Sequence, residues 1–201
     1  MPPSHPAMGQ HGGMSTEQQP PTGPRYLWVL RHAKAVADPP AGGGDYDRPL
    51  TTRGRRDATD LGTRLAAGEG VFGLDGVVLP QVILSSSAAR TYQTAELVAG
   101  HLGGGLTPDA YRSLYAADTD QVLQIVREVD EQVTSAMYVG HNPTVFRFAW
   151  EVLEVDGADR DTLYDHGFAT CSVAVVRFDG LAWEDVAAGT GTLCGVFSPP
   201  Y

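Results

Sequence analysis

Three short apolar runs, each followed by a helix-like segment, constrain the fold of this chain more than any other feature. They occupy residues 26–30, 81–84 and 136–139. Continuous apolar runs of this length are typical of strands buried on both faces, and strands that alternate with helices form a largely parallel sheet. We therefore expect an α/β fold in three layers, with helices on both sides of a mostly parallel, mixed sheet.

The C-terminal third has a different pattern. Two apolar runs, residues 171–178 and 181–186, flank the dipeptide Asp179-Gly180. Asp-Gly between two apolar runs is a strong signal for a tight β-turn. The sequence therefore predicts an antiparallel hairpin at the C-terminal end of the domain, which makes the sheet mixed.

Helix starts follow each of the first three runs. Thr51 or Thr52 can cap a first helix, and any of the serines at positions 85–87 can cap a second. Asn142 and Pro143 suit the N-cap and the first position of a third helix, because proline lacks the N–H that a helix start leaves unpaired.

Composition separates a tail from a domain. Residues 1–24 are rich in Pro, Gly and Gln, and almost no aliphatic side chain is available there to offset the entropy of ordering. We expect a disordered tail over residues 1–24 and a single domain over residues 25–201, a length that can bury a sizeable core.

The charge, the apolar segments and the cysteines of the chain exclude several classes of partner and cofactor. Fourteen Lys and Arg against 24 Asp and Glu give a net charge of −10, which disfavours nucleic acid and anionic membranes. No apolar stretch reaches the roughly 20 residues of a membrane helix, and the N-terminus does not resemble a secretory signal, so we expect a cytoplasmic protein. Cys171 and Cys194 do not have a metal or redox spacing, and we expect neither a metal nor a cofactor.

Cationic and imidazole side chains follow all three early strands. Arg31 and His32 follow the first, Arg90 follows the second and His141 follows the third. Ligands of open α/β sheets bind outside the carboxyl ends of the strands, so we expect these side chains to meet there. Arg48, in the loop before the first helix, could join them.

This combination suits phosphoryl transfer. Arginine forks match the charged oxygens of a phosphoryl group, and a neutral imidazole can attack phosphorus. Neighbouring arginines keep an imidazole neutral by penalising its protonated form. The residues alone therefore indicate His32 as a nucleophile held among arginines. A structural cluster of ion pairs is the alternative interpretation.

Four segments, residues 30–35, 48–54, 85–95 and 139–143, resemble in order the motifs of the histidine phosphatase superfamily, also called phosphoglycerate mutase-like. Within it the compact chain is most similar to the SixA-type phosphohistidine phosphatases. The resemblance implies that fold, with His32 as the phosphorylated nucleophile. It also implies that Arg31, Arg90 and His141 act with it in catalysis by binding phosphate, and that Arg48 joins them. We add Asn142 to this phosphate-binding set.

The chain departs from relatives that use a proton-donating carboxyl group. Residues 113–116 lack the glutamate of mutase-like relatives, and Asn142 stands where acid phosphatases have an aspartate. Asp45, Asp47 and Asp118 could substitute for this acid, but loop aspartates are more often solvated turn residues, and we interpret each of the three in that way. Ester cleavage loses about 10² to 10⁴ in rate without a general acid, which favours the more easily protonated P–N bond.

The favoured hypothesis is therefore a metal-independent phosphatase that acts on phosphohistidine in a partner protein. The alternatives are a small-molecule phosphomonoesterase, with mutase activity ranked below it, and a phosphate-recognition module that turns nothing over.

Overall fold

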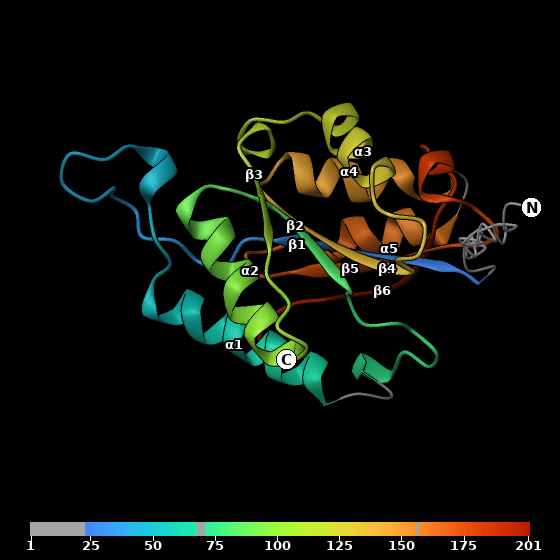
Figure 1. Cartoon of the computed structure of the whole chain (residues 1–201), viewed down its shortest axis with the longest axis horizontal. Helices are drawn as coiled ribbons and strands as arrows, with labels where there is room; N and C mark the ends of the chain where they lie inside the picture. The colour runs from blue at the N-terminus through green and yellow to red at the C-terminus, as the bar shows by residue number, and fades with distance from the viewer. Residues whose placement is uncertain (1–22, 68–70, 156) are drawn as a thin grey trace, which may run out of the picture.

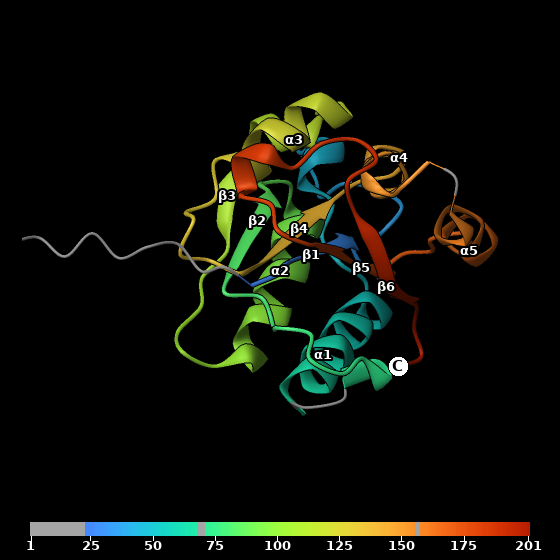
Figure 2. The ribbon, with the colours of Figure 1, turned by 90° about the vertical axis from the view of Figure 1, so that its right-hand side faces the viewer.

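The computed structural model describes residues 23–67, 71–155 and 157–201. In this part of the chain a central sheet separates two layers of helices (Figures 1 and 2). Nearly all of the predicted tail, residues 1–24, lies outside the described residues, which begin at Gly23. Among the described residues, no helix has the length and apolar character needed to span a bilayer.

The sheet is mixed and mostly parallel, as predicted. Its strands are β1 (Arg25–Arg31), β2 (Val82–Ser86), β3 (Asp109–Tyr111), β4 (Ser135–Gly140), β5 (Val173–Phe178) and β6 (Thr192–Phe197). They lie in the order β3-β2-β4-β1-β5-β6. The first four in that order are parallel, whereas β5 runs antiparallel to β1 and β6 antiparallel to β5.

Helices cover both faces of this sheet (Figure 2). One layer holds α1 (Thr52–Ala66) and α2 (Ala89–Leu102), and the other holds α3 (Thr119–Arg127), α4 (Thr144–Val152) and α5 (Ala158–His166). The central strand β1 contributes to both cores, because successive strand residues point to opposite faces. Leu27 and Val29 pack with the α3–α5 layer, whereas Trp28 and Leu30 pack with α1 and α2.

The predicted hairpin is only half right. The antiparallel partner of β5 is β6, and residues 181–186 contain instead a 3₁₀ turn at Trp183–Asp185. The buried indole of Trp183 explains this, since its Nε1 donates to the carbonyl of Val133 at 2.6 Å and its backbone N–H to Glu131 at 2.7 Å. The apolar side chains after Gly180 therefore pack against the core instead of pairing with β5.

Two of the three predicted helix caps differ from the structure. Thr51 caps α1 by accepting a hydrogen bond from the N–H of Gly54 at 3.0 Å, as expected. None of the serines at 85–87 is the N-cap of α2, whose N-cap position is Ala88. Ser86 and Ser87 instead bond to His141 and Tyr46.

The start of α4 also differs from the prediction. Pro143 occupies the N-cap position, so Asn142 lies one residue before it. The side-chain amide of Asn142 points towards the carbonyl of Phe168, at 3.5 Å. Asn142 is thus directed at the strand-end region beside Arg31, which bonds the same carbonyl.

Candidate active site

The candidate site lies where β1, β2 and β4 end. Arg31 is paired with Gly140 across the β1–β4 ladder, so the two strands finish side by side. A cavity of about 380 Å³ opens there. It is lined by Arg31, His32, Lys34, Ala35, Asp45, Arg48, Arg90, His141, Asn142 and Thr170. All six residues predicted for the site from the sequence thus line one cavity.

The backbone around His32 is held by three different elements. The N–H of His32 donates to the carbonyl of Gly140 at 3.0 Å, and its carbonyl accepts from Cys171 at 3.1 Å. The next N–H, that of the buried Ala33, donates to the hydroxyl of Thr94 on α2 at 3.0 Å. These bonds fix the position of His32 before any ligand arrives.

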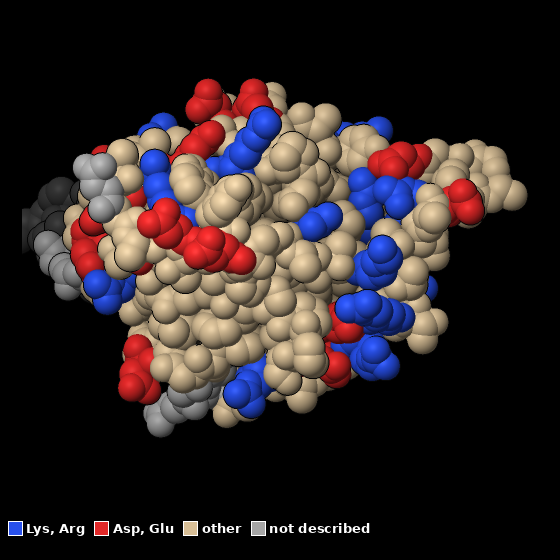
Figure 3. Space-filling model, turned by 180° about the vertical axis from the view of Figure 1, so that it is seen from behind, with Lys and Arg blue, Asp and Glu red and all other residues tan. Residues whose placement is uncertain are grey.

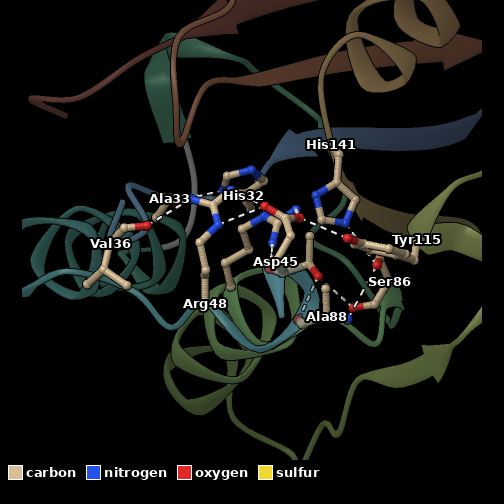
Figure 4. A network of polar contacts seen from close by, with 11 residues as sticks. His32, Ala33, Val36, Asp45, Arg48, Ser86, Ala88, Tyr115 and His141 are labelled. Carbon is tan, nitrogen blue, oxygen red and sulfur yellow. Dashed lines mark hydrogen bonds and ion pairs between the residues drawn. The ribbon is translucent and has the colours of Figure 1, made fainter. Parts of the chain in front are cut away.

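The imidazole of His32 is held in one tautomer. Its Nδ1 lies 2.8 Å from the carbonyl oxygen of Ala33 (Figure 4). Because a carbonyl can only accept, Nδ1 carries the hydrogen and Nε2 keeps a free lone pair. The pKa of His32 is lowered to about 4, mainly by burial and also by the charges of Arg90 and Arg31. The hydrogen bond to Ala33 opposes this shift. The ring is therefore neutral at pH 7.

His141 faces His32 across the cavity. The two ring centroids are 5.2 Å apart, and Nε2 of His141 lies 2.9 Å from the hydroxyl of Ser86. Burial, together with His32 and Arg90, lowers the pKa of His141 to about 3. Its Nδ1 is buried without a hydrogen-bond partner among the described residues. A second neutral imidazole thus has one ring nitrogen whose hydrogen-bonding capacity the described residues leave unsatisfied.

Three arginines surround the imidazoles. Arg31 donates to the carbonyl of Phe168 at 3.0 Å. Arg90 lies in the first turn of α2 and is only 6 % exposed. Arg48 is held by the carbonyl of Val36, at 2.7 Å from Nη1. The cavity is therefore strongly cationic in a protein of net charge −10.

Four residues that line the cavity were not assigned to the site from the sequence, and these are Lys34, Ala35, Thr170 and, most important, Asp45. It was interpreted as a solvated turn residue, but its carboxylate lies between Arg48, Arg90 and Tyr115 (Figure 4). The bond from the Tyr115 hydroxyl and those from Arg48 and Arg90 lower the pKa of Asp45 to about 2. Its position three residues before Arg48, in the turn Asp45–Asp47, is the signal that could have indicated the pair.

Asp47 and Asp118 lie outside the cavity. Asp47 accepts from the N–H of Gly44 at 2.9 Å, and Asp118 caps α3 by accepting from Gln121 at 2.9 Å. Asp45 is therefore the single carboxylate among the residues that line the cavity.

Basic side chains also gather around this end of the molecule. In the space-filling view, Lys and Arg are concentrated along the edge from which the loop between β1 and α1 projects (Figure 3). Such a local concentration attracts anions despite the acidic total charge. Within the described ranges, no three or more His, Cys, Asp and Glu side chains are grouped so as to hold a metal ion.

Comparison with known proteins agrees with this geometry. Residues 27–115 match the model of the histidine phosphatase superfamily (branch 1). An uncharacterized protein of Mycobacterium tuberculosis is 33% identical over 174 residues, which cover 85% of this chain and 99% of the relative.

Two solved structures are similar over nearly their whole length. A putative phosphohistidine phosphatase SixA from Nakamurella multipartitia has a TM-score of 0.73 and 29% identity, covering 91% of this chain and 100% of that one. A putative SixA from Agrobacterium tumefaciens has a TM-score of 0.66 and 27% identity, covering 88% and 99%. The chain, with its strand-end histidines and arginines, therefore belongs to the histidine phosphatase superfamily and is SixA-like.

Proposed function

We propose that this phosphatase hydrolyses phosphohistidine in a partner protein, with His32 as the nucleophile. The observation that carries the proposal is the hydrogen bond from Nδ1 of His32 to the carbonyl of Ala33, 2.8 Å long. It leaves the Nε2 lone pair as the free nucleophilic site of a neutral ring, in a cavity lined by arginines. An imidazole placed in this way is ready to attack phosphorus.

The reaction proceeds in two displacements. In the first, Nε2 of His32 forms a bond to phosphorus while the P–N bond to the substrate imidazole breaks, and the departing nitrogen takes a proton from water. In the second, water attacks the phosphorus and gives a proton to the hydroxide left by the first step, the bond to Nε2 breaks, and inorganic phosphate leaves. Arg31, Arg48, Arg90 and Asn142 would hold the phosphoryl oxygens, and His141 would contact them through Nδ1.

The protonation state of the cavity supports a P–N substrate. An alkoxide leaving group needs a proton donor, but Asp45 is ionised at neutral pH because its pKa is about 2. An imidazole leaves more readily, since its nitrogen is protonated more easily than an ester oxygen.

The position of the cavity supports a protein substrate. Asp45, on the loop between β1 and α1, lines the cavity with a side chain that is 53% exposed, so this side of the site borders solvent. A phosphohistidine on the surface of another protein could enter from that side. The two similar structures described above carry the name of putative phosphohistidine phosphatases, which favours the same class.

The test compares four substrates with purified protein in the presence of a chelator. These are a phosphohistidine peptide, phosphoramidate, p-nitrophenyl phosphate and a sugar phosphate. We expect selective P–N cleavage that is lost in His32→Ala and retained in His101→Ala, which removes an exposed histidine near the far end of α2.

The other outcomes are equally definite. Efficient turnover of the sugar phosphate would assign the chain to the small-molecule phosphomonoesterases. Loss of all activity in chelator would refute metal independence, and phosphate binding without turnover of any substrate would identify a recognition module.

A further inference from the structure

Asp45 occupies the hydrogen-bonding edges of two arginines that face the cavity. Its Oδ1 accepts a hydrogen bond from Nε of Arg48 at 2.8 Å and lies 2.7 Å from Nη2 of the same arginine in an ion pair. Its Oδ2 accepts from Nη2 of Arg90 at 3.0 Å, and its backbone carbonyl accepts from Nη1 of the same arginine at 2.7 Å. A single residue thus engages both guanidinium groups.

The hydrogen-bonding capacity that remains on Arg48 and Arg90 limits how a ligand can bind them. Nη1 of Arg48 is bonded to the carbonyl of Val36, so all three nitrogens of Arg48 already have a partner. In Arg90 the buried Nε is the one nitrogen without a partner among the described residues. A phosphoryl group therefore cannot take a two-pronged hold on the Nε–Nη2 edge of Arg48 while Asp45 stays in place.

Electrostatic repulsion also disfavours simultaneous occupancy of the cavity by Asp45 and a phosphoryl group. A phosphoryl group carries up to two negative charges, and the Asp45 carboxylate carries a third into the same cavity. Like charges at such short range in a partly buried site repel strongly. The carboxylate and the phosphoryl group compete for the same cations.

The side chain of Asp45 has room to withdraw from the arginines. The base of its loop is fixed by the bridge between Ala35 and Leu50. There is open space beside Gly44, the residue before Asp45, because a Cβ atom added there would meet no atom within 4 Å. The Asp45 side chain is itself 53% exposed. Tyr46 holds the rest of the turn through its bond to Ser87 and its contact with the Tyr115 ring. Withdrawal of the Asp45 side chain alone would break no buried apolar contact, because no residue of the turn Asp45–Asp47 is buried.

We propose that Asp45 is an internal competitor for phosphate, which holds Arg48 and Arg90 in the empty site and leaves when a phosphoryl group binds. The proposal rests on the proposed function only in taking this cavity as the phosphoryl site. Its consequence is weaker binding of inorganic phosphate, the product, and hence faster clearance of the site. Asp45 determines affinity without taking part in bond making.

The test measures the equilibrium binding of inorganic phosphate to the full chain by calorimetry. If the Asp45-bound state holds about nine-tenths of the molecules, removing it tightens phosphate binding about tenfold in Asp45→Asn. Asp47→Asn is the matched control: it removes the same charge from an exposed residue of the same turn, outside the cavity, and should bind phosphate like the wild type.

A second variant keeps the test decisive if Asp45→Asn folds poorly. Tyr115→Phe removes the 2.8 Å bond from the Tyr115 hydroxyl to Asp45 but keeps the aromatic ring and both arginines. It should tighten phosphate binding by a smaller factor. Unchanged or weaker binding in both variants would overturn the proposal and make Asp45 a residue that positions the arginines. Because binding is measured without turnover, the hydrolytic activity can fail while this inference holds, and the reverse is equally detectable.

Discussion

His32 and His141 are brought together by strand pairing itself. The N–H of His32 donates to the carbonyl of Gly140, the residue before His141, and the two rings lie 5.2 Å apart. The distance between nucleophile and second histidine is therefore set by the β1–β4 ladder rather than by a loop. Changes in the surface loops should therefore leave the spacing of the two rings intact. Protonation of either ring, by contrast, would disturb the pair.

The first prediction concerns stability in acid. The folded-state pKa values of His32 and His141 are about 4 and 3, below the value of about 6.5 in an unfolded chain. Between pH 6.5 and 4 the unfolded chain thus binds more protons, and stability falls as the pH falls. His32 alone contributes at most about 3 kcal/mol to this loss, less after solvent screening.

Urea unfolding at pH 7.5 and 4.5 checks this. The difference between the two pH values should shrink in His32→Gln and persist in His101→Gln. An unchanged difference in His32→Gln would mean that the ring is already protonated in the folded state.

The second prediction concerns Arg90, which is nearly buried at the start of α2. Lysine keeps the charge but not the planar fork, so Arg90→Lys should lower kcat/KM for phosphoramidate about 100-fold. Arg56→Lys, an exposed change on α1, should leave kcat/KM unaltered. A loss of less than threefold in Arg90→Lys would show that charge alone suffices.

The third prediction concerns Ser86 as a positioning residue. Its hydroxyl lies 2.9 Å from Nε2 of His141 and fixes the orientation of that ring. Ser86→Ala should lower kcat about tenfold with a small change in KM, and Ser86→Thr should restore most of the activity. Ser85→Ala, which removes a hydroxyl bonded only to a neighbouring carbonyl, is the control. Equal effects of the two alanine variants would indicate a general packing defect.

The fourth prediction concerns the contact between α1 and the loop after β1. A Cβ atom at Gly54 would overlap the backbone carbonyl of Lys34, which cannot move freely because Thr51 bonds to it. Gly54→Ala should therefore destabilise the protein by about 1–3 kcal/mol. Gly100→Ala, on α2 with open space around it, should stabilise it by about 0.5–1 kcal/mol. Denaturant unfolding of both variants gives the comparison, and equal stabilities would refute the overlap.

The parts of the fold that the sequence predicted are those with local signals. Strands buried on both faces, such as β1 and β4, appear in the sequence as continuous apolar runs. His32 and His141 follow these runs, so the sequence alone predicts that both lie at strand ends. The family motifs then supplied Arg48, whose loop position alone left its contact with the cavity open.

The parts that were not predicted depend on long-range packing. Trp183 belongs to an apolar run that fits a strand, but its indole is drawn into the core beside Val133, and β6 takes its place beside β5. The short edge strand β3 and the polar helix α5 have weak patterns and were not anticipated. Asp45 has the composition of a turn residue, and only the meeting of its loop with α2 turns it into a partner of Arg90.

The arrangement of β1 has a consequence for engineering. This strand is buried on both faces and ends at Arg31, directly before His32, so the reactive centre is anchored in the middle of the sheet. The segment at residues 36–47, by contrast, projects from the molecule and contacts the centre mainly through Asp45 and Tyr46 (Figure 1). The nucleophile is thus held by the sheet, whereas Val36 and Asp45, which contact Arg48 and Arg90, belong to the projecting segment. Exchange of residues 37–44 alone, for a stretch of another length or charge, would leave His32 and the contacts of Val36 and Asp45 with the arginines in place.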